Sequence, residues 1–151
     1  MKFKHKYIRI LFLLIALVVS STVNAQEDLR INSIFKKYGK QKGATMVVMS
    51  GKVLKDYDLS KYRSITINYD KAIFNEIQEC IEDDKEGAHK IKEIINNGVI
   101  VSAYYQLISN ESKINKYILF NVDNNYKATL IYMEGGINSD MLIEKLFLKQ
   151  K

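Results

Sequence analysis

The feature that most limits the possible folds is a series of three strand-like segments in the C-terminal half of the chain, joined by short polar connections. The segments cover 99–109, 116–122 and 126–133, and they are rich in β-branched and aromatic residues. The Asp-Asn-Asn stretch at 123–125 is typical of a hairpin turn. Strands joined by such short connections run antiparallel. The sequence therefore predicts an antiparallel meander.

Two further strands are predicted upstream of the meander. Residues 44–50 form a compact apolar run between two glycines, which is too short for a helix and predicts a central strand. Residues 64–69 alternate strictly between polar and apolar side chains, and this pattern predicts a half-solvated strand.

Helical spacing of apolar residues predicts four helices. The first lies within 27–38, and the second starts after Asp70, which suits a helix N-cap. An acidic patch at 82–86 interrupts the second helix, after which the helical period resumes over 88–95 and stops at Asn97 and Gly98. A final helix begins near Asn138 or Ser139.

The predicted order of elements is therefore α-β-β-α-α-β-β-β-α. The simplest fold that buries these apolar stripes is a two-layer α+β domain, in which helices pack on one face of a mainly antiparallel sheet of about five strands. Residues 26–151 form one domain of ordinary size. The lone Cys80 excludes an internal disulfide, and we expect it to be buried on a helix as a small apolar residue.

The N-terminal residues have the pattern of an export signal. Four basic side chains within 2–9 precede an uncharged apolar run at 10–19, and Val23-Asn24-Ala25 offers modest or small side chains for cleavage after Ala25. We therefore predict a signal peptide at 1–25 and a periplasmic or secreted protein. The alternative is an uncleaved N-terminal anchor.

Charge argues against a nucleic-acid partner. Removing residues 1–25 takes away four basic and no acidic residues, which lowers the formal net charge from +6 to +2. Binding that neutralises phosphates needs a concentrated basic face. We expect no nucleic-acid partner and no membrane span after cleavage, and the sequence leaves the oligomeric state open.

The usual signatures of catalysis and metal binding are missing from the sequence. His89 is the only histidine after residue 25, and one Cys with one His does not make a zinc site. We therefore predict no catalytic residue, no metal site and no cofactor. An enzyme with an unfamiliar site remains an alternative, and it would use His89 with carboxylates of the acidic region: Glu79, Glu82, Asp83 or Asp84.

Tyrosines on the predicted strands are the candidate binding residues: Tyr104, Tyr105, Tyr117 and Tyr132. Tyr104 and Tyr105 are adjacent in one strand, so they face opposite sides of the sheet. Aromatic rings on an open sheet face suit contacts with a protein or a glycan of the cell envelope. The predicted function is a non-enzymatic interaction module that uses its sheet face or edge, and the other alternative is a carrier of a small apolar ligand.

Several stretches of the chain together resemble a known family. They are Ala25-Gln26, the passage from 34–38 into 43–50, the strand start at 63–67, and the strand with its Gly-Gly exit at 129–136. These stretches look like small exported proteins of unknown function from Gram-negative gut-type bacteria. The resemblance covers almost the whole chain after residue 25, and it implies an α+β fold and a cell-envelope location. It brings no catalytic or binding residues to this sequence.

Overall fold

The computed structural model describes residues 29–145 of the chain. The predicted signal peptide at 1–25 and the last six residues lie outside this range. Within it, none of the helices is long and apolar enough to cross a membrane.

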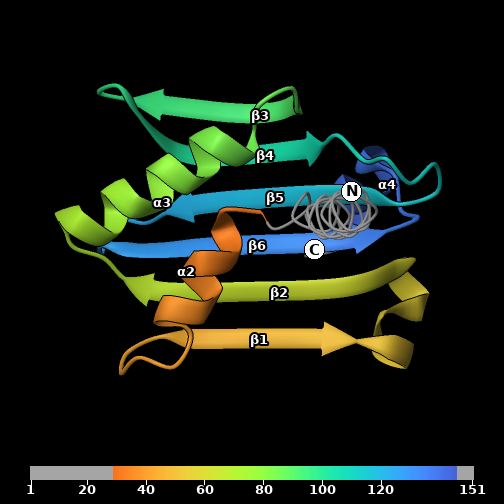
Figure 1. The fold of residues 1–151 in the computed structure, drawn as a ribbon, viewed down its shortest axis with the longest axis horizontal. Helices are drawn as coiled ribbons and strands as arrows, with labels where there is room; N and C mark the ends of the chain where they lie inside the picture. The colour runs from red at the N-terminus through yellow and green to blue at the C-terminus, as the bar shows by residue number, and fades with distance from the viewer. Residues whose placement is uncertain (1–28, 146–151) are drawn as a thin grey trace, which may run out of the picture.

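The described residues form a single six-stranded sheet in which all neighbouring strands are antiparallel, in the order β1-β2-β6-β5-β4-β3 (Figure 1). The elements in chain order are α2 (Ile31–Tyr38), β1 (Thr45–Ser50), the 3-10 helix η1 (Gly51–Tyr57), β2 (Leu59–Asn68), α3 (Lys71–Asp84), β3 (His89–Asn96), β4 (Val99–Leu107), β5 (Asn115–Val122), β6 (Lys127–Gly135) and α4 (Ser139–Ile143). The α+β class is confirmed, and the predicted meander corresponds to β4, β5 and β6.

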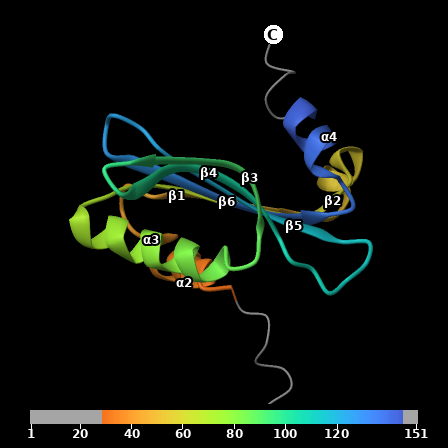
Figure 2. The same ribbon diagram turned by 90° about the horizontal axis from the view of Figure 1, so that it is seen from above.

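The sequence had predicted that the helices pack on one face of the sheet, and this part of the prediction was wrong. Helices α2 and α3 cover one face of the sheet, and α4 lies on the opposite side (Figure 2). The main core fills the space under α2 and α3, where Ile34, Ile81 and Ile118 are fully buried. A smaller apolar cluster lies on the other face and includes Tyr117, Met133 and Leu142 of α4. Because α4 is short, much of this second face has no helix of the described residues 29–145 over it.

The prediction of a helix over 88–95 was wrong, since this segment is strand β3. The isoleucines at 91, 94 and 95 have helical spacing, but the pairing with β4 shifts at Lys90/Lys92 and again at Ile94/Ile95. Such irregularities hide the two-residue period of a strand. Asn97 and Gly98 both have positive φ (51° and 79°), as a tight hairpin turn requires, and they join β3 to β4 instead of ending a helix. The sheet therefore has six strands, not five.

The prediction of a central strand at 44–50 was also wrong in its placement. Strand β1 lies at one edge of the sheet and pairs with β2 alone. Five of its six residues are exposed, including Val47 and Val48. An apolar run signals a strand, but it does not distinguish a buried central strand from an exposed edge.

Local signals for helix starts are confirmed. The Asp70 carboxylate accepts a hydrogen bond from the Ile73 amide at 2.8 Å, and the Asn138 side chain accepts one from the Met141 amide at 2.9 Å. These two N-caps fix the starts of α3 and α4. Asp123 accepts hydrogen bonds from two amides in the turn between β5 and β6, as expected for a hairpin.

Candidate ligand-binding groove

Side chains on the open face of the sheet, opposite α2 and α3, form two rows that run across all six strands. Directly opposed residues of antiparallel neighbours share a face, so the strand register defines each row. The first row is mostly polar and consists of Thr45, Thr66, Thr129, Asn121, Ser102 and Ile94. The second row lies two residues away on each strand, is mostly apolar, and consists of Val47, Ser64, Ile131, Leu119, Tyr104 and Lys92.

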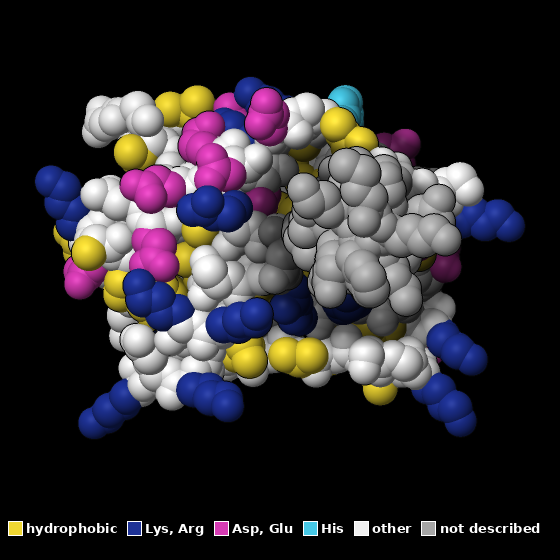
Figure 3. All heavy atoms as spheres, in the orientation of Figure 1, with side chains coloured by type: hydrophobic (Ala, Val, Ile, Leu, Met, Phe, Trp, Pro, Cys, Tyr) yellow, Lys and Arg dark blue, Asp and Glu magenta, His cyan; other side chains and the backbone are white. Residues whose placement is uncertain are grey.

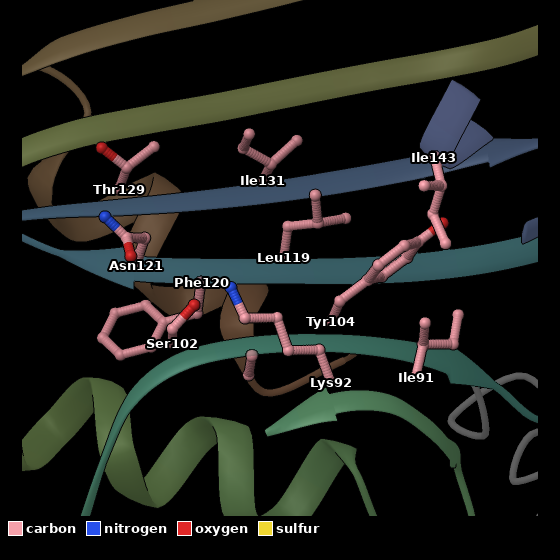
Figure 4. A pocket seen from close by; sticks show the side chains of 11 residues that line it. Ile91, Lys92, Ser102, Tyr104, Leu119, Phe120, Asn121, Thr129, Ile131 and Ile143 are labelled. Carbon is pink, nitrogen blue, oxygen red and sulfur yellow. The ribbon is translucent and has the colours of Figure 1, made fainter. Parts of the chain in front are cut away.

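A groove of about 720 Å³ lies over the middle of these rows. Its apolar lining comes from five elements, β3, β4, β5, β6 and α4, and includes Ile91, Tyr104, Leu119, Ile131 and Ile143 (Figure 4). The side chains of Leu119 and Ile131 stand on neighbouring strands and form the centre of this lining. A site of this size with mostly apolar walls is typical of small-molecule binding.

Polar groups gather at one end of the groove. Ser102, Asn121 and Thr129 lie there on adjacent strands, and Lys92 extends from β3 over the sheet toward them (Figure 4). Among residues 29–145, no carboxylate lies within ion-pair distance of Lys92, in contrast to Lys85 and Lys90 on the other face. The groove therefore has an apolar end near α4 and a polar end with one cation.

Two of the four candidate tyrosines, Tyr104 and Tyr117, lie on this face with ring centroids 5.9 Å apart. Both rings are buried. The Tyr117 hydroxyl donates a hydrogen bond of 2.7 Å to the Ile137 carbonyl, and burial raises the pKa of Tyr117 to about 12. The Tyr104 hydroxyl points toward Ile143 and, although it is buried, has no hydrogen-bond partner among the described residues (Figure 4). Burial raises the pKa of Tyr104 well above its ordinary value.

The other two candidate tyrosines, Tyr105 and Tyr132, lie on the opposite face in the core under α2 and α3. The Tyr105 hydroxyl donates to Glu93, and the Tyr132 hydroxyl donates to Glu134. The expectation that Tyr104 and Tyr105 face opposite sides is therefore confirmed. Two of the four rings are therefore buried on each face, and the four do not make one surface. A role in binding remains a prediction for each.

A second hollow, of about 310 Å³, lies on the α2 side of the sheet and is polar. Lys61 and Glu134 form an ion pair of 3.2 Å in its wall, and the Arg63 guanidinium lies over the Phe35 ring at 4.8 Å. Lys61 and Tyr132 thus both contact Glu134 in this wall, whereas Lys92 of the larger groove has no ion-pair partner among the described residues.

The residues named for the enzyme alternative do not line either hollow. Glu79, Glu82, Asp83 and His89 are exposed. Asp84 has a structural contact, because its carboxylate accepts hydrogen bonds from the Arg30 and Ile31 amides at 2.7 and 2.8 Å, at the start of α2. Cys80 is buried on α3, as predicted, and burial raises the pKa of its thiol. Within the described part of the chain, no three Cys, His, Asp or Glu side chains are placed to hold a metal ion.

The sequence predicted the strands that correspond to β4, β5 and β6 and named Tyr104, but it missed β3 and the other residues that line the groove. Alternation in β5 puts Tyr117, Leu119 and Asn121 on one face, which was readable. Their pairing with Ile131 and Ser102 depends on strand register, which the sequence alone does not define.

The fold and groove define a small α+β domain, built as one antiparallel sheet with a helix-covered face and a largely open face that holds the groove. The chain belongs to the family of unknown function DUF6108, whose sequence profile matches residues 18–146. This confirms the resemblance to a family of unknown function; the bacterial source and the export signal stay predictions. A comparison with curated proteins gave no match.

Proposed function

We propose that this domain is a non-enzymatic binding module that holds a small amphipathic ligand in the groove on the open face of its sheet. The observation that carries the proposal is the groove itself, about 720 Å³ in volume and open to solvent between the sheet and α4. Pockets that bind small ligands fall in this range of volume and combine apolar walls with a few polar groups.

The apolar end of the groove supports a ligand with a hydrocarbon or ring body. Leu119, Ile131 and Ile143 present apolar side chains to the groove from β5, β6 and α4. Covering such surface removes it from water, and each square ångström of apolar area contributes about 25 cal/mol. A ligand that covers these residues would thus be held mainly by the hydrophobic effect.

The polar end supports a ligand with a polar or anionic head. Ser102, Asn121 and Thr129 offer hydroxyl and amide groups, and Lys92 offers an ammonium without an acidic partner in the described structure. The buried Tyr104 hydroxyl lies at the other end of the groove, toward Ile143, and adds one donor that lacks an acceptor among the described residues. In sites of this kind, a small number of polar groups in defined positions orients the ligand and provides specificity.

We also propose that the domain acts outside the cytoplasm, in the periplasm or beyond the cell. The basic start, the uncharged apolar run at 10–19 and the small residue Ala25 support this location. A ligand-binding module in that compartment would meet lipids and other amphipathic molecules of the envelope, which suits the two ends of the groove.

The experiment is a binding titration of the purified protein with a saturated long-chain fatty acid and with the alcohol of the same chain length. We expect both probes to bind and Ile131→Ser to weaken both about tenfold, since it removes apolar contact worth roughly 1.4 kcal/mol. Lys92→Met should weaken the fatty acid more than the alcohol, because only the acid carries a charge.

The matched control is Ile95→Ser, the same substitution at an exposed isoleucine outside the groove. Circular dichroism and a thermal melt show whether each variant is folded. The proposal fails if neither probe binds the wild-type protein, or if Ile95→Ser weakens binding as much as Ile131→Ser.

A further inference from the structure

The two edges of the sheet differ in how they are protected against pairing with another strand. Strand β3 carries charged side chains, among them Lys90, Lys92 and Glu93, and its register shifts twice. Charges and bulges of this kind are the usual means of blocking an edge. Strand β1 has neither charges nor a register shift.

Strand β1 is a regular and uncharged edge. Its residues pair one for one with β2, from Thr45 opposite Thr66 to Ser50 opposite Lys61. In the described structure no strand covers its outer side. It contains no proline, and Val48 is 58 % exposed. The backbone N–H and C=O groups along the outer side of such an edge are free to pair with an added strand.

Cations lie at both ends of this edge and no acid lies between them. Residues 39–55 contain four lysines and no Asp or Glu: Lys40 and Lys42 precede β1, and Lys52 and Lys55 follow it. All four are exposed. Figure 3 shows Lys and Arg side chains at both ends of the edge that β1 forms, with hydrophobic side chains between them.

We infer that β1 accepts an extended segment of a partner protein as a seventh strand, and that this segment is apolar at its centre and acidic at both ends. The main chain would supply the ladder of hydrogen bonds, as in other cases of strand addition. Alternate side chains of the added strand would lie beside Val47 on the groove face and beside Met46 and Val48 on the other face.

Charge complementarity selects this partner over a second copy of the chain. Two copies that paired antiparallel through β1 would bring the Lys40 and Lys42 end of one copy against the Lys52 and Lys55 end of the other. Like charges placed opposite one another oppose association, whereas acidic residues at the ends of a partner strand favour it.

The test uses a short synthetic peptide with alternating valine and threonine at its centre and acidic residues at both ends. Its affinity for the purified protein is measured at low salt and compared with that of a peptide with the same centre and lysines at the ends. We expect the acidic peptide to bind about tenfold or more tightly than the basic one, given several exposed ion pairs. The same peptide N-methylated at every residue of its centre should not bind, because neither of its edges can then form the ladder.

The variant that reverses all four charges, Lys40→Glu with Lys42→Glu, Lys52→Glu and Lys55→Glu, should reverse the preference for the two peptides. Amide hydrogen exchange should slow in β1 and not in β3 when the acidic peptide is added. The inference is overturned if neither peptide binds. It is also overturned if exchange slows at β3, or if changing the four lysines to glutamine yields dimers while no peptide binds, since the lysines would then only prevent self-association.

Discussion

The unpartnered Tyr104 hydroxyl leads to the prediction that removing it stabilises the protein. Tyr104 is 4 % exposed, and its hydroxyl has no hydrogen-bond partner among the described residues. A buried polar group without a partner costs about 1–3 kcal/mol. Tyr104→Phe keeps the ring and removes this group, so we expect the free energy of unfolding to rise by about 1 kcal/mol, at the low end of that range.

Tyr117→Phe is the matched variant, because it makes the same chemical change in a ring next to that of Tyr104. The Tyr117 hydroxyl donates a buried hydrogen bond of 2.7 Å to the Ile137 carbonyl. That carbonyl also accepts a hydrogen bond of 3.1 Å from the side-chain amide (Nδ2) of Asn115, so it keeps one partner when the hydroxyl is removed. The loss is then that of one ordinary hydrogen bond, about 1 kcal/mol. The two variants should differ by about 2 kcal/mol, with Tyr104→Phe the more stable.

Urea denaturation monitored by circular dichroism measures this difference, provided that the free energy of unfolding falls with urea concentration at the same slope in both variants. A thermal melt should separate them by about 8 °C, since each kcal/mol shifts the midpoint by about 4 °C in a domain of this size. If Tyr104→Phe destabilises the protein as much as Tyr117→Phe does, the Tyr104 hydroxyl has a partner in solution and the reasoning is refuted. If Tyr104 contacts the ligand, Tyr104→Phe will also weaken binding while it stabilises the fold, a trade-off known from functional sites.

Three further predictions concern the helix contact, the pH dependence and the export signal. Asp84→Ala removes the acceptor of two amide hydrogen bonds at the start of α2, so the free energy of unfolding should fall by about 1–2 kcal/mol in urea denaturation. The Tyr105 hydroxyl and the Lys85 ammonium hold the pKa of Glu93 below its usual value of 4.5, so its stabilising effect is present above pH 4.5 and is lost as the pH falls through the lowered pKa. Glu93→Gln should therefore lose less stability than the wild type when the pH is lowered from about 5 to about 3. Intact-mass measurement of the protein recovered from bacterial cells should show cleavage after Ala25.

Each of these predictions has its own control. Asp83→Ala removes only an exposed ion pair with Arg30 and should change stability by less than about 0.5 kcal/mol, so an equal loss from Asp83→Ala would contradict the role given to Asp84. If the wild type and Glu93→Gln lose the same amount of stability when the pH is lowered, the proposed role of the Glu93 pKa is contradicted. An uncut chain of full mass would favour the uncleaved anchor.

The sequence predicts the parts of the fold that depend on neighbouring residues. The alternation at 64–69, the hairpin residues at 123–125 and the N-caps Asp70 and Asn138 each act over a few positions, and all are found in the structure. Local patterns of this kind leave a direct trace in the order of residues.

The parts that failed depend on tertiary pairing. The spacing of Ile91, Ile94 and Ile95 fits a helix as well as an irregular strand, and only the ladder with β4 decides between them. The Asn97-Gly98 pair is a strong hairpin signal, but such a pair also ends helices. Because the preceding segment was wrongly predicted to be a helix, the pair was interpreted as a helix end. The edge position of β1 reflects strand order, which the sequence does not show.

The candidate site was only partly readable for the same reason. Tyr104 and Tyr117 were identified from sequence: Tyr104 lines the groove, and the Tyr117 ring lies next to the Tyr104 ring. Leu119 and Ile131 form its centre because β5 and β6 pair in a particular register. A shift of one residue in that register would turn a whole strand's side chains to the opposite face.

The most direct test of the proposed function is a map of the backbone amide signals by nuclear magnetic resonance while the saturated long-chain fatty acid is added. The proposal predicts that the largest shifts fall on the open face, at Ser102, Leu119 and Ile131 and in α4, and that the signals of α2 and α3 change little. If a saturating concentration of the fatty acid leaves these signals unchanged, or shifts only the signals of α2 and α3, a ligand site in the groove is contradicted.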